Sequence, residues 1–493
     1  MSAPGRLTGE VGVRTRRLIY GELAPPDLQL ELSYLSRVDQ AHLLMLAAQG
    51  LVPAEAARTL LTGIEQLRAD GYRQLFGRPA PRGIYLMYEG YLSEQLGPEI
   101  GGQLHTGRSR NDLKATITAM RLRDWLLDFA GQAARLEAVL LARARAYRTV
   151  LMPVYTHYQA AMPVSYGYYL LGVGRAVGRD LDAIQAAADG LRVCPLGAGA
   201  VAGSDLPIDP ARTARLLGFS RPSAHALDAV ASRDAALRVL AAATGLAITV
   251  SRLAADLQLW STVEFGLVRF PDRLVGGSSA MPQKRNAFLL EHVRAKPALA
   301  VGAWTAAATA MSATPFTNSI EVGTEAVSAI WPGLLACEHA VLLCQTLVSG
   351  ARPVPERMRE RAAAGFTNAT ALANQLVRQA IPFRTAHQLV GDAVRQAVAA
   401  GSTDLAGYGP PGWLDGVDPA MLDLDGLLEA QAHGGGPGAF GPVFTQSLVE
   451  WSAHRDWCAE WRRGVAEAEA ELSTAVRQLL ACPPATSSAG DAA

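Results

Sequence analysis

Lysine is nearly absent from this chain of 493 residues: of its 45 basic residues, only Lys114, Lys284 and Lys296 are lysine. Cysteine is also scarce, and the five cysteines contain no CxxC pair. An odd number of cysteines in so long a chain argues against a disulfide framework, and no metal site is expected. Positive and negative side chains balance to a formal net charge of zero, so neither nucleic acid nor an anionic membrane is expected as a partner.

Long apolar runs are missing too. Residues 1–12 are mostly small and polar and contain no signal-peptide core. No uncharged stretch of about 20 apolar residues, the length that spans a bilayer, follows, so we expect a cytoplasmic protein. Hydrophobic residues make up 49% of the chain and charged residues 18%, which is typical of a globular protein, and abundant alanine and leucine favour helices. Cys337 and Cys344, seven residues apart, are expected on one buried helix face.

Helical periodicity dominates the middle of the chain. Similar apolar patterns occupy residues 168–191, 231–263 and 289–310, and apolar residues recur at helical spacing at Leu122, Leu126, Leu127, Ala130 and Ala134. Helices that are apolar over most of their circumference must be buried, here in a bundle of several subunits. Other helices are expected before residue 99, with a restart after Pro53, and at 357–364, 369–377 and 442–480. We divide the chain into an N-terminal helical domain (1–108), a central long-helix bundle (109–352), a C-terminal helical domain (353–482) and a disordered tail (483–493).

One loop combines several chemically useful groups. Residues 276–286, GGSSAMPQKRN, contain two glycines, which let a backbone approach a ligand, and hydroxyl, ammonium and amide groups, which bind carboxylates. Lys284 stands out because the chain otherwise uses arginine, and lysine supplies a compact point charge. The alternative is a solvated surface loop that happens to contain a lysine.

Two further motifs bear on this choice. Residues 102–112 are GQLHTGRSRND and residues 155–159 are YTHYQ. With the loop, they resemble the signature regions of the fumarase/aspartase superfamily, and specifically of the argininosuccinate lyase family. The resemblance extends to PLGAGA at 195–200 and PID at 207–209, and it covers the chain from about Leu32 to the region of Trp461. Three motifs in this order are highly specific for the superfamily and less specific for the substrate.

The resemblance implies an all-α fold of three helical domains, with five long helices per subunit. It also implies a homotetramer around a twenty-helix core, with composite active sites. The activity that it implies is that of a carbon–nitrogen lyase that eliminates an amine from an N-substituted aspartate and releases fumarate. General acid–base chemistry suffices for this elimination, so neither a metal nor an organic cofactor is expected. The expected partners are a small-molecule substrate and further copies of the chain.

The resemblance also assigns roles to residues. Ser278 is the base that takes the proton beside a carboxylate, and its alkoxide needs support from loop amides and from Lys284. Lys284 and Asn286 hold the carboxylate that becomes the aci-form. His157 donates a proton or stabilises charge, paired with Glu291. The remaining substrate-binding residues expected from the motifs are Ser109, Arg110, Asn111, Thr156 and Gln159.

Some of these residues also suit a structural role. A single histidine such as His157 is more often packed or exposed than catalytic. Glu291 suits the first turn of a helix, where the helix dipole favours a carboxylate. Arg108 and Arg110 are equally suited to structural ion pairs, and His105 is expected to be a structural neighbour of the site.

Three departures from the family pattern concern the substrate. The family's substrate-side histidine corresponds to Tyr85, and Lys114 lies in an NDLK stretch where the family has NDQV. The segment that grips the arginine end aligns without gaps to residues 316–324, where the family's tyrosine, glutamine and lysine correspond to Phe316, Glu321 and Thr324. Losing a lysine and gaining a carboxylate shifts this pocket by two charge units toward negative. We therefore expect a leaving group that lacks a carboxylate there, or presents a cation or an apolar group. The alternative is a displaced alignment, with other residues holding the arginine moiety.

Two classes of function remain open. One is an enzyme, either an ordinary argininosuccinate lyase of arginine biosynthesis or a relative with a different leaving amine. The other is a non-catalytic relative, like the lens crystallins that share this fold. A structural protein would not require the joint presence of Ser278, His157, Lys284, Asn286 and Glu291, so this set favours catalysis.

Overall fold

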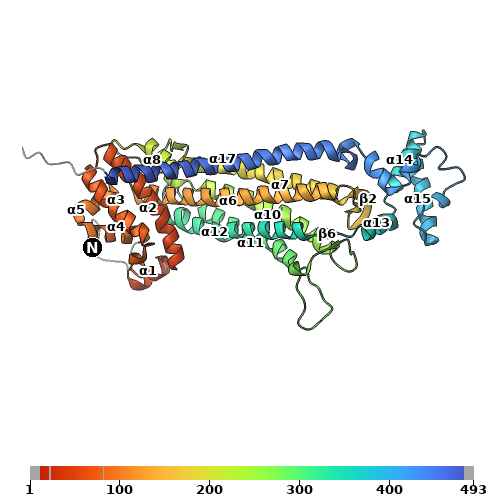
Figure 1. Cartoon of the computed structure of the whole chain (residues 1–493), viewed down its shortest axis with the longest axis horizontal. Coiled ribbons are helices and arrows are strands. Elements are labelled where there is room, and N and C mark those ends of the chain that lie inside the picture. Colours follow the sequence, from red (N-terminus) through yellow and green to blue (C-terminus); the bar gives the residue numbers. More distant parts are fainter. Residues whose placement is uncertain (1–11, 21–23, 81–82, 482–493) are drawn as a thin grey trace, which may run out of the picture.

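The computed structural model describes residues 12–20, 24–80 and 83–481. The molecule is a long rod of roughly parallel helices (Figure 1). Its middle consists of the long helices α6 (Arg110–Ala146), α7 (Tyr166–Ala188), α10 (Asp234–Trp260), α11 (Phe288–Met311) and α12 (Val327–Gly350). The predicted all-α fold with a central bundle of long helices is therefore confirmed, whereas the tetrameric core stays a prediction.

One end of the rod is built by the N-terminal helices (Figure 1). They are α1 (Val13–Tyr20), α2 (Pro25–Ala48), α3 (Ala54–Ala69), α4 (Ile84–Leu96) and α5 (Pro98–Gly101), with the 3-10 turns η1 (Arg73–Leu75) and η2 (Gly102–His105). The predicted restart after Pro53 is confirmed, because Pro53 is the N-cap residue of α3. These helices have their own apolar core, which Leu472 and Val476 near the end of the chain complete.

The opposite end consists of shorter helices that follow the bundle. They are α13 (Pro355–Ala364), α14 (Ala369–Arg378), α15 (Phe383–Ala399) and α16 (Leu424–Ala430), with the turns η6 (Ala406–Tyr408), η7 (Pro419–Met421), η8 (His433–Gly435) and η9 (Pro437–Ala439). The final helix α17 (Phe440–Ala481) then runs back along α6 and α7 to the N-terminal helices (Figure 1). The domain boundaries stay a prediction, but α17 lies along the bundle rather than beside α13–α16. The predicted tail, 483–493, lies outside the described residues.

Within the described residues, three two-stranded sheets lie between the helices. Helical periodicity alone did not predict these sheets. β1 (Leu151–Thr156) and β2 (Gln159–Ser165) form an antiparallel hairpin at the end of the bundle where α6 stops. β3 (Val193–Cys194) pairs in parallel with β4 (Arg221–Pro222), and β5 (Val268–Arg269) pairs antiparallel with β6 (Arg352–Pro353). The remaining elements are α8 (Pro210–Leu216), α9 (Ala226–Ala231), η3 (Asp189–Arg192), η4 (Asp272–Leu274) and the π-helix η5 (Glu321–Ala326).

The core of the bundle contains the predicted apolar positions. The residues of α6 at helical spacing, Leu122, Leu126, Leu127, Ala130 and Ala134, are all buried. Cys337 and Cys344 are buried together in α12, as expected of small apolar side chains. Two segments, Asp234–Trp260 and Glu321–Gly350, are long and apolar enough to cross a membrane, and half of the most apolar window in each is buried inside the molecule. Core helices meet the same criterion, so the cytoplasmic location stays a prediction.

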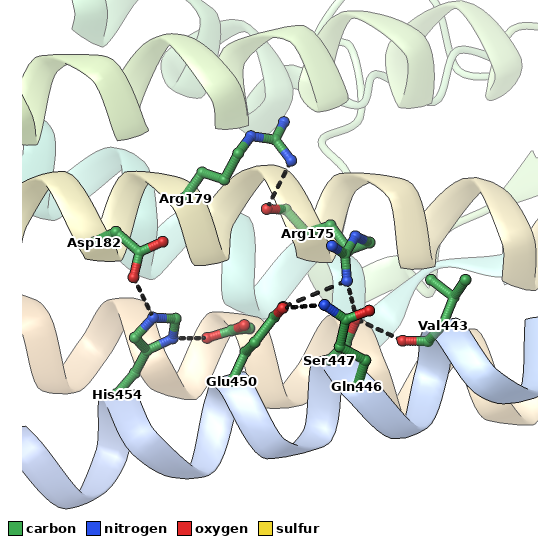
Figure 2. A network of polar contacts seen from close by, with 9 residues as sticks. Arg175, Arg179, Asp182, Val443, Gln446, Ser447, Glu450 and His454 are labelled. Carbon is green, nitrogen blue, oxygen red and sulfur yellow. Dashed lines mark hydrogen bonds and ion pairs between the residues drawn. The ribbon is translucent and has the colours of Figure 1, made fainter. Parts of the chain in front are cut away.

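A polar network fastens α17 to the bundle (Figure 2). His454 of α17 lies between two carboxylates, with its Nδ1 3.0 Å from Glu137 Oε2 of α6 and its Nε2 3.1 Å from Asp182 Oδ1 of α7. Two turns away, the Arg175 guanidinium of α7 donates to Ser447 Oγ at 3.1 Å and to Glu450 Oε2 at 3.3 Å. Burial lowers the pKa of His454, but the two carboxylates outweigh burial, and the pKa is raised above its ordinary value.

We expect His454→Ala to destabilise the protein, because the Glu137 carboxylate would stay buried without its cation. Loss of one partner of a buried pair costs about 3 kcal/mol or more. Since the raised pKa belongs to the folded state, the contribution of His454 is full below about pH 6.5 and is lost as the pH rises through the folded-state pKa. Calorimetric melting of the wild type and the variant should therefore show a difference that shrinks toward alkaline pH.

The matched control for this measurement is Arg463→Ala, since Arg463 is an exposed cation on the same helix. It should change the stability by no more than about 0.5 kcal/mol. A His454→Ala deficit that stays constant between about pH 5 and pH 9 would show that the imidazolium charge contributes nothing to the attachment of α17.

Candidate active site

The first motif opens α6 at the N-terminal end of the bundle. Ser109 is the N-cap: its side chain accepts from Asn111 N at 3.3 Å, and Asp112 Oδ1 accepts from Ser109 N at 3.0 Å, which completes a capping box. Such reciprocal bonds satisfy the free amides of a first helical turn. Arg110 is exposed in that turn. The predicted binding residues Ser109, Arg110 and Asn111 are thus presented by a rigid helix start.

Asp112 connects this motif to the PLGAGA segment. It is fully buried, and its Oδ2 accepts from Gly197 N at 3.1 Å and from Gly199 N at 2.9 Å. Both glycines have positive φ, and a Cβ at either would lie within 3 Å of a neighbour, so no other residue fits. Asn111 Nδ2 donates to Ala200 O at 3.0 Å and fixes the end of the same loop.

A cluster of buried and half-buried titratable side chains, formed by Tyr85, His105, Arg108 and Asp39, lies next to the start of α6. Tyr85 is 9% exposed, and its hydroxyl lies 2.7 Å from His105 Nδ1 and accepts from Arg108 at 3.1 Å. Arg108 forms a fully buried ion pair with Asp39 at 2.5 Å, so its role is structural. Burial, and after it the charge of Arg108, lowers the pKa of His105 to about 4, so this histidine is neutral at pH 7. Tyr85, predicted to bind substrate, is therefore a largely buried neighbour of the site.

The second motif lies at the tip of the β1–β2 hairpin. His157 and Tyr158 form the two-residue turn, and both have positive φ, 51° and 60°. Hairpin turns of this kind favour Asn-Gly, because side chains with a Cβ are disfavoured there. Thr156, His157, Tyr158 and Gln159 are all exposed. His157 is a functional candidate because its backbone conformation is strained. Residues with strained backbones are concentrated at functional sites.

The third motif is a loop that projects from the side of the bundle near β6 (Figure 1). Its base is closed by two hydrogen bonds of 2.8 Å between the backbones of Gly276 and Asn286. Ser278 Oγ accepts from Ala280 N at 3.3 Å and from Met281 N at 3.1 Å. Two backbone amides of the loop thus point at this oxygen, and the role of Ser278 as the base stays a prediction. Lys284 is exposed and, within the described residues, has no hydrogen bond to Ser278.

Glu291 lies in the first turn of α11, a position in which the helix dipole favours a carboxylate. Its Oε1 accepts from Gln258 Nε2 at 3.1 Å, and Gln258 in turn accepts from Arg294 at 2.8 Å. No hydrogen bond or ion pair joins Glu291 to His157 within the described part of one chain. The predicted pairing of these two residues stays a prediction.

The segment expected to hold the leaving group lies at the same end as the first motif. Phe316 is 64% exposed in the connection before η5, Glu321 is exposed at the start of η5, and Thr324 is half-buried. Lys114 Nζ of α6 donates to Thr324 Oγ1 at 2.6 Å. The charge count made from the sequence left out this ammonium, which stands beside Thr324. The altered charge of the pocket stays a prediction.

The candidate residues fall into two groups, at the two ends of the bundle. Residues 109–114 and 316–324 lie where α6 begins, and residues 156–159 and 276–291 lie where it has ended. The helix between them has 37 residues, which at 1.5 Å per residue is about 55 Å. One chain therefore cannot bring the three motifs together.

Comparisons with known proteins give the same family as the motifs. The family described as "Lyase" matches residues 30–302, and the family "Argininosuccinate lyase C-terminal" matches residues 366–407. The argininosuccinate lyase of Methanoculleus marisnigri is 39% identical over 75% of this chain and 74% of its own length. That of Halorhodospira halophila is 36% identical over 80% of this chain and 86% of its own length.

The chain belongs to the argininosuccinate lyase family. It is thus a carbon–nitrogen lyase of the fumarase/aspartase superfamily, and the crystallin-like alternative falls away. Solved structures agree. EDDS lyase in complex with formate has a TM-score of 0.82 at 29% identity, with 92% of both chains covered. A class II fumarase from Schistosoma mansoni has a TM-score of 0.64 at 17% identity, over 79% of this chain and 91% of its own, and supports the fold alone.

We predict that Ser278→Ala and His157→Asn each lower turnover at least about a hundredfold, the usual effect of removing an acid–base group. Neither side chain is part of the core, so the fold should persist. His157→Asn should melt no lower than the wild type, because asparagine tolerates positive φ better than histidine does. Fumarate release and thermal melting test both statements. Turnover close to that of the wild type in either purified variant would remove that residue from the mechanism.

Proposed function

We propose that this lyase eliminates an amine from an N-substituted aspartate, releases fumarate and has an altered leaving-group pocket. The observation that carries the proposal is Ser278, whose Oγ accepts two backbone amides inside a glycine-rich loop. Backbone donors aimed at an oxygen stabilise negative charge on it, which a serine needs if it is to act as a base. The fumarate bound in a structure of an EDDS lyase variant, 27% identical with a TM-score of 0.81, supports fumarate as the product.

In the proposed mechanism, the Ser278 alkoxide removes the proton beside one carboxylate of the succinyl group. Lys284 and Asn286 hold that carboxylate as it becomes the aci-form, and an ammonium and an amide suit this charge. The carbon–nitrogen bond then breaks, and the departing nitrogen takes up a proton. His157, oriented by Glu291, either donates that proton or stabilises the developing charge while the proton taken up by Ser278 passes to the nitrogen. Ser109, Asn111 and Thr156 hold the succinyl carboxylates, and Gln159 lies beside them.

We also propose that the active enzyme is a homotetramer with composite sites. The motifs lie about 55 Å apart along one chain, as the length of α6 requires. Helix α11 buries only five of its 24 residues, Leu290, Val293, Pro297, Ala300 and Ala307. It also exposes the large apolar side chains of Leu299, Val301 and Trp304, which further subunits would cover.

Complementation tests the composite site. Asn111→Ala and Ser278→Ala should each be inactive alone, because they disable opposite ends of every chain. Refolding an equal mixture should restore about a quarter of the wild-type turnover, since each site would draw its two ends at random from two pools of chains. Each variant refolded by itself is the control. Oligomers shown by mass spectrometry to be mixed, and still inactive, would mean that both residues of a site come from one chain.

Two leaving-group assignments compete. An altered pocket is favoured by Phe316, which has no hydroxyl to donate, and by the Glu321 carboxylate. An ordinary argininosuccinate lyase is favoured by Lys114, which returns a positive charge beside Thr324, and by the argininosuccinate lyases that are 36% and 39% identical to this chain. We propose the altered pocket, because a site that lacks required polar partners discriminates strongly against the original substrate.

Argininosuccinate should therefore be a poor substrate. We expect kcat/KM well below about 10⁴ M⁻¹s⁻¹, the lower edge of the ordinary enzyme range. Fumarate absorbance measures it directly, beside a panel of aspartates carrying other amines on nitrogen. A value at or above that limit for argininosuccinate would identify a plain argininosuccinate lyase.

A further inference from the structure

Lys114 is placed as a ligand-binding cation would be. It lies in the second turn of α6, one turn after Arg110 on the same face. Its ammonium has three donors, of which one is used, to Thr324 Oγ1 at 2.6 Å. The side chain is exposed, and within the described residues it forms no ion pair. The acids whose charge acts on Lys114 are Glu31 and Glu325, and Glu31 is already paired with Arg121 at 2.9 Å.

A second cation, Arg233, lies beside η5, and its charge acts on Lys114. It is 8% exposed and stands directly before α10. Its Nη1 donates to the backbone oxygens of Val230 and Ser232, and in the described structure its Nε has no partner. Its Nη2 lies 3.9 Å from where a Cβ of Gly323 would be, so the guanidinium packs on η5. No carboxylate in the described part forms an ion pair with it.

This arrangement is costly for a protein without a ligand. Cations near the N-terminus of a helix oppose its dipole, and like charges four residues apart repel each other. The charge of Arg233 is buried without a counterion, which is unfavourable as well. The π-helical turn that both cations contact is itself a rare conformation that is frequent at functional sites. A bound anion at η5 would offset all of these costs.

We propose that Lys114 is a specificity-determining residue, which binds a carboxylate on the departing amine from the α6 side of the pocket, with Arg233 behind it. The inference rests on the proposed function. It replaces the sequence-based expectation that the leaving group lacks a carboxylate. The cation has moved from η5 to α6, so the acidic group of the preferred amine lies differently from that of arginine. The succinyl carboxylates stay with the Ser109 and Asn111 side of the helix start.

The test uses amines in pairs that differ by one carboxylate: arginine and agmatine, or 2,3-diaminopropionate and ethylenediamine. Each is supplied as its N-substituted aspartate, and fumarate release is followed for the pair that the wild type turns over faster. The wild type should prefer the member with the carboxylate. Lys114→Met should lower kcat/KM for that member about tenfold to a hundredfold, the scale of a charge-assisted hydrogen bond, and change the other less than about threefold.

Two more variants separate binding from a structural role. Thr324→Val removes the hydrogen bond of Lys114 but keeps its charge, so it should retain the preference for the carboxylate. The double variant Lys114→Met/Thr324→Lys returns an ammonium from η5 and should recover part of the preference. Thermal melting checks that each variant is folded.

The outcomes are distinct. If Lys114→Met lowers kcat/KM equally for both members of the pair, or if Thr324→Val has the same effect as Lys114→Met, Lys114 is a structural link between α6 and η5 and the inference fails, while the lyase function stands. If the wild type releases fumarate from no N-substituted aspartate, the proposed function fails instead.

Discussion

The stiffness of α6 is the constraint on which the rest of the molecule depends. A helix of 37 residues cannot fold back on itself, so the chemistry at its start and the chemistry beyond its end stay about 55 Å apart in every conformation of one chain. At the far end, His157 and most of the 276–286 loop are exposed in one chain. Helix α11 exposes large apolar side chains, along which the proposed subunits would meet.

The two ends of the bundle solve different structural problems. At the start of α6, local rules are obeyed: Ser109 caps the helix, and Asp112 binds two glycine amides. At the other end, local rules are broken, because a histidine takes a left-handed conformation at a hairpin tip. Proteins break local preferences chiefly where function requires it. The proposed positioning of substrate therefore belongs to the first end, and the proposed acid–base chemistry to the second.

The sequence predicted what depends on periodicity and on local motifs. Helices α10, α11 and α17 begin within three residues of their predicted starts, since apolar spacing and proline mark helix limits. The sequence did not predict that α17 runs back to α2 and α3. An apolar helix face indicates that the helix packs against something, but not which element it packs against. The contact of Lys114 with Thr324 was hidden for the same reason: 210 residues separate the two, and only packing brings them together.

The proposed role of that contact would let a lyase of this architecture change its substrate without changing its chemistry. Within one chain, residues 109–114 and 316–324 are separated by the length of the bundle from His157, Ser278 and Glu291. A charge that moves between α6 and η5 alters what the pocket accepts, but it leaves untouched the loop amides around Ser278. Substrate choice and proton transfer are then set by separate parts of the fold, and they meet only on assembly.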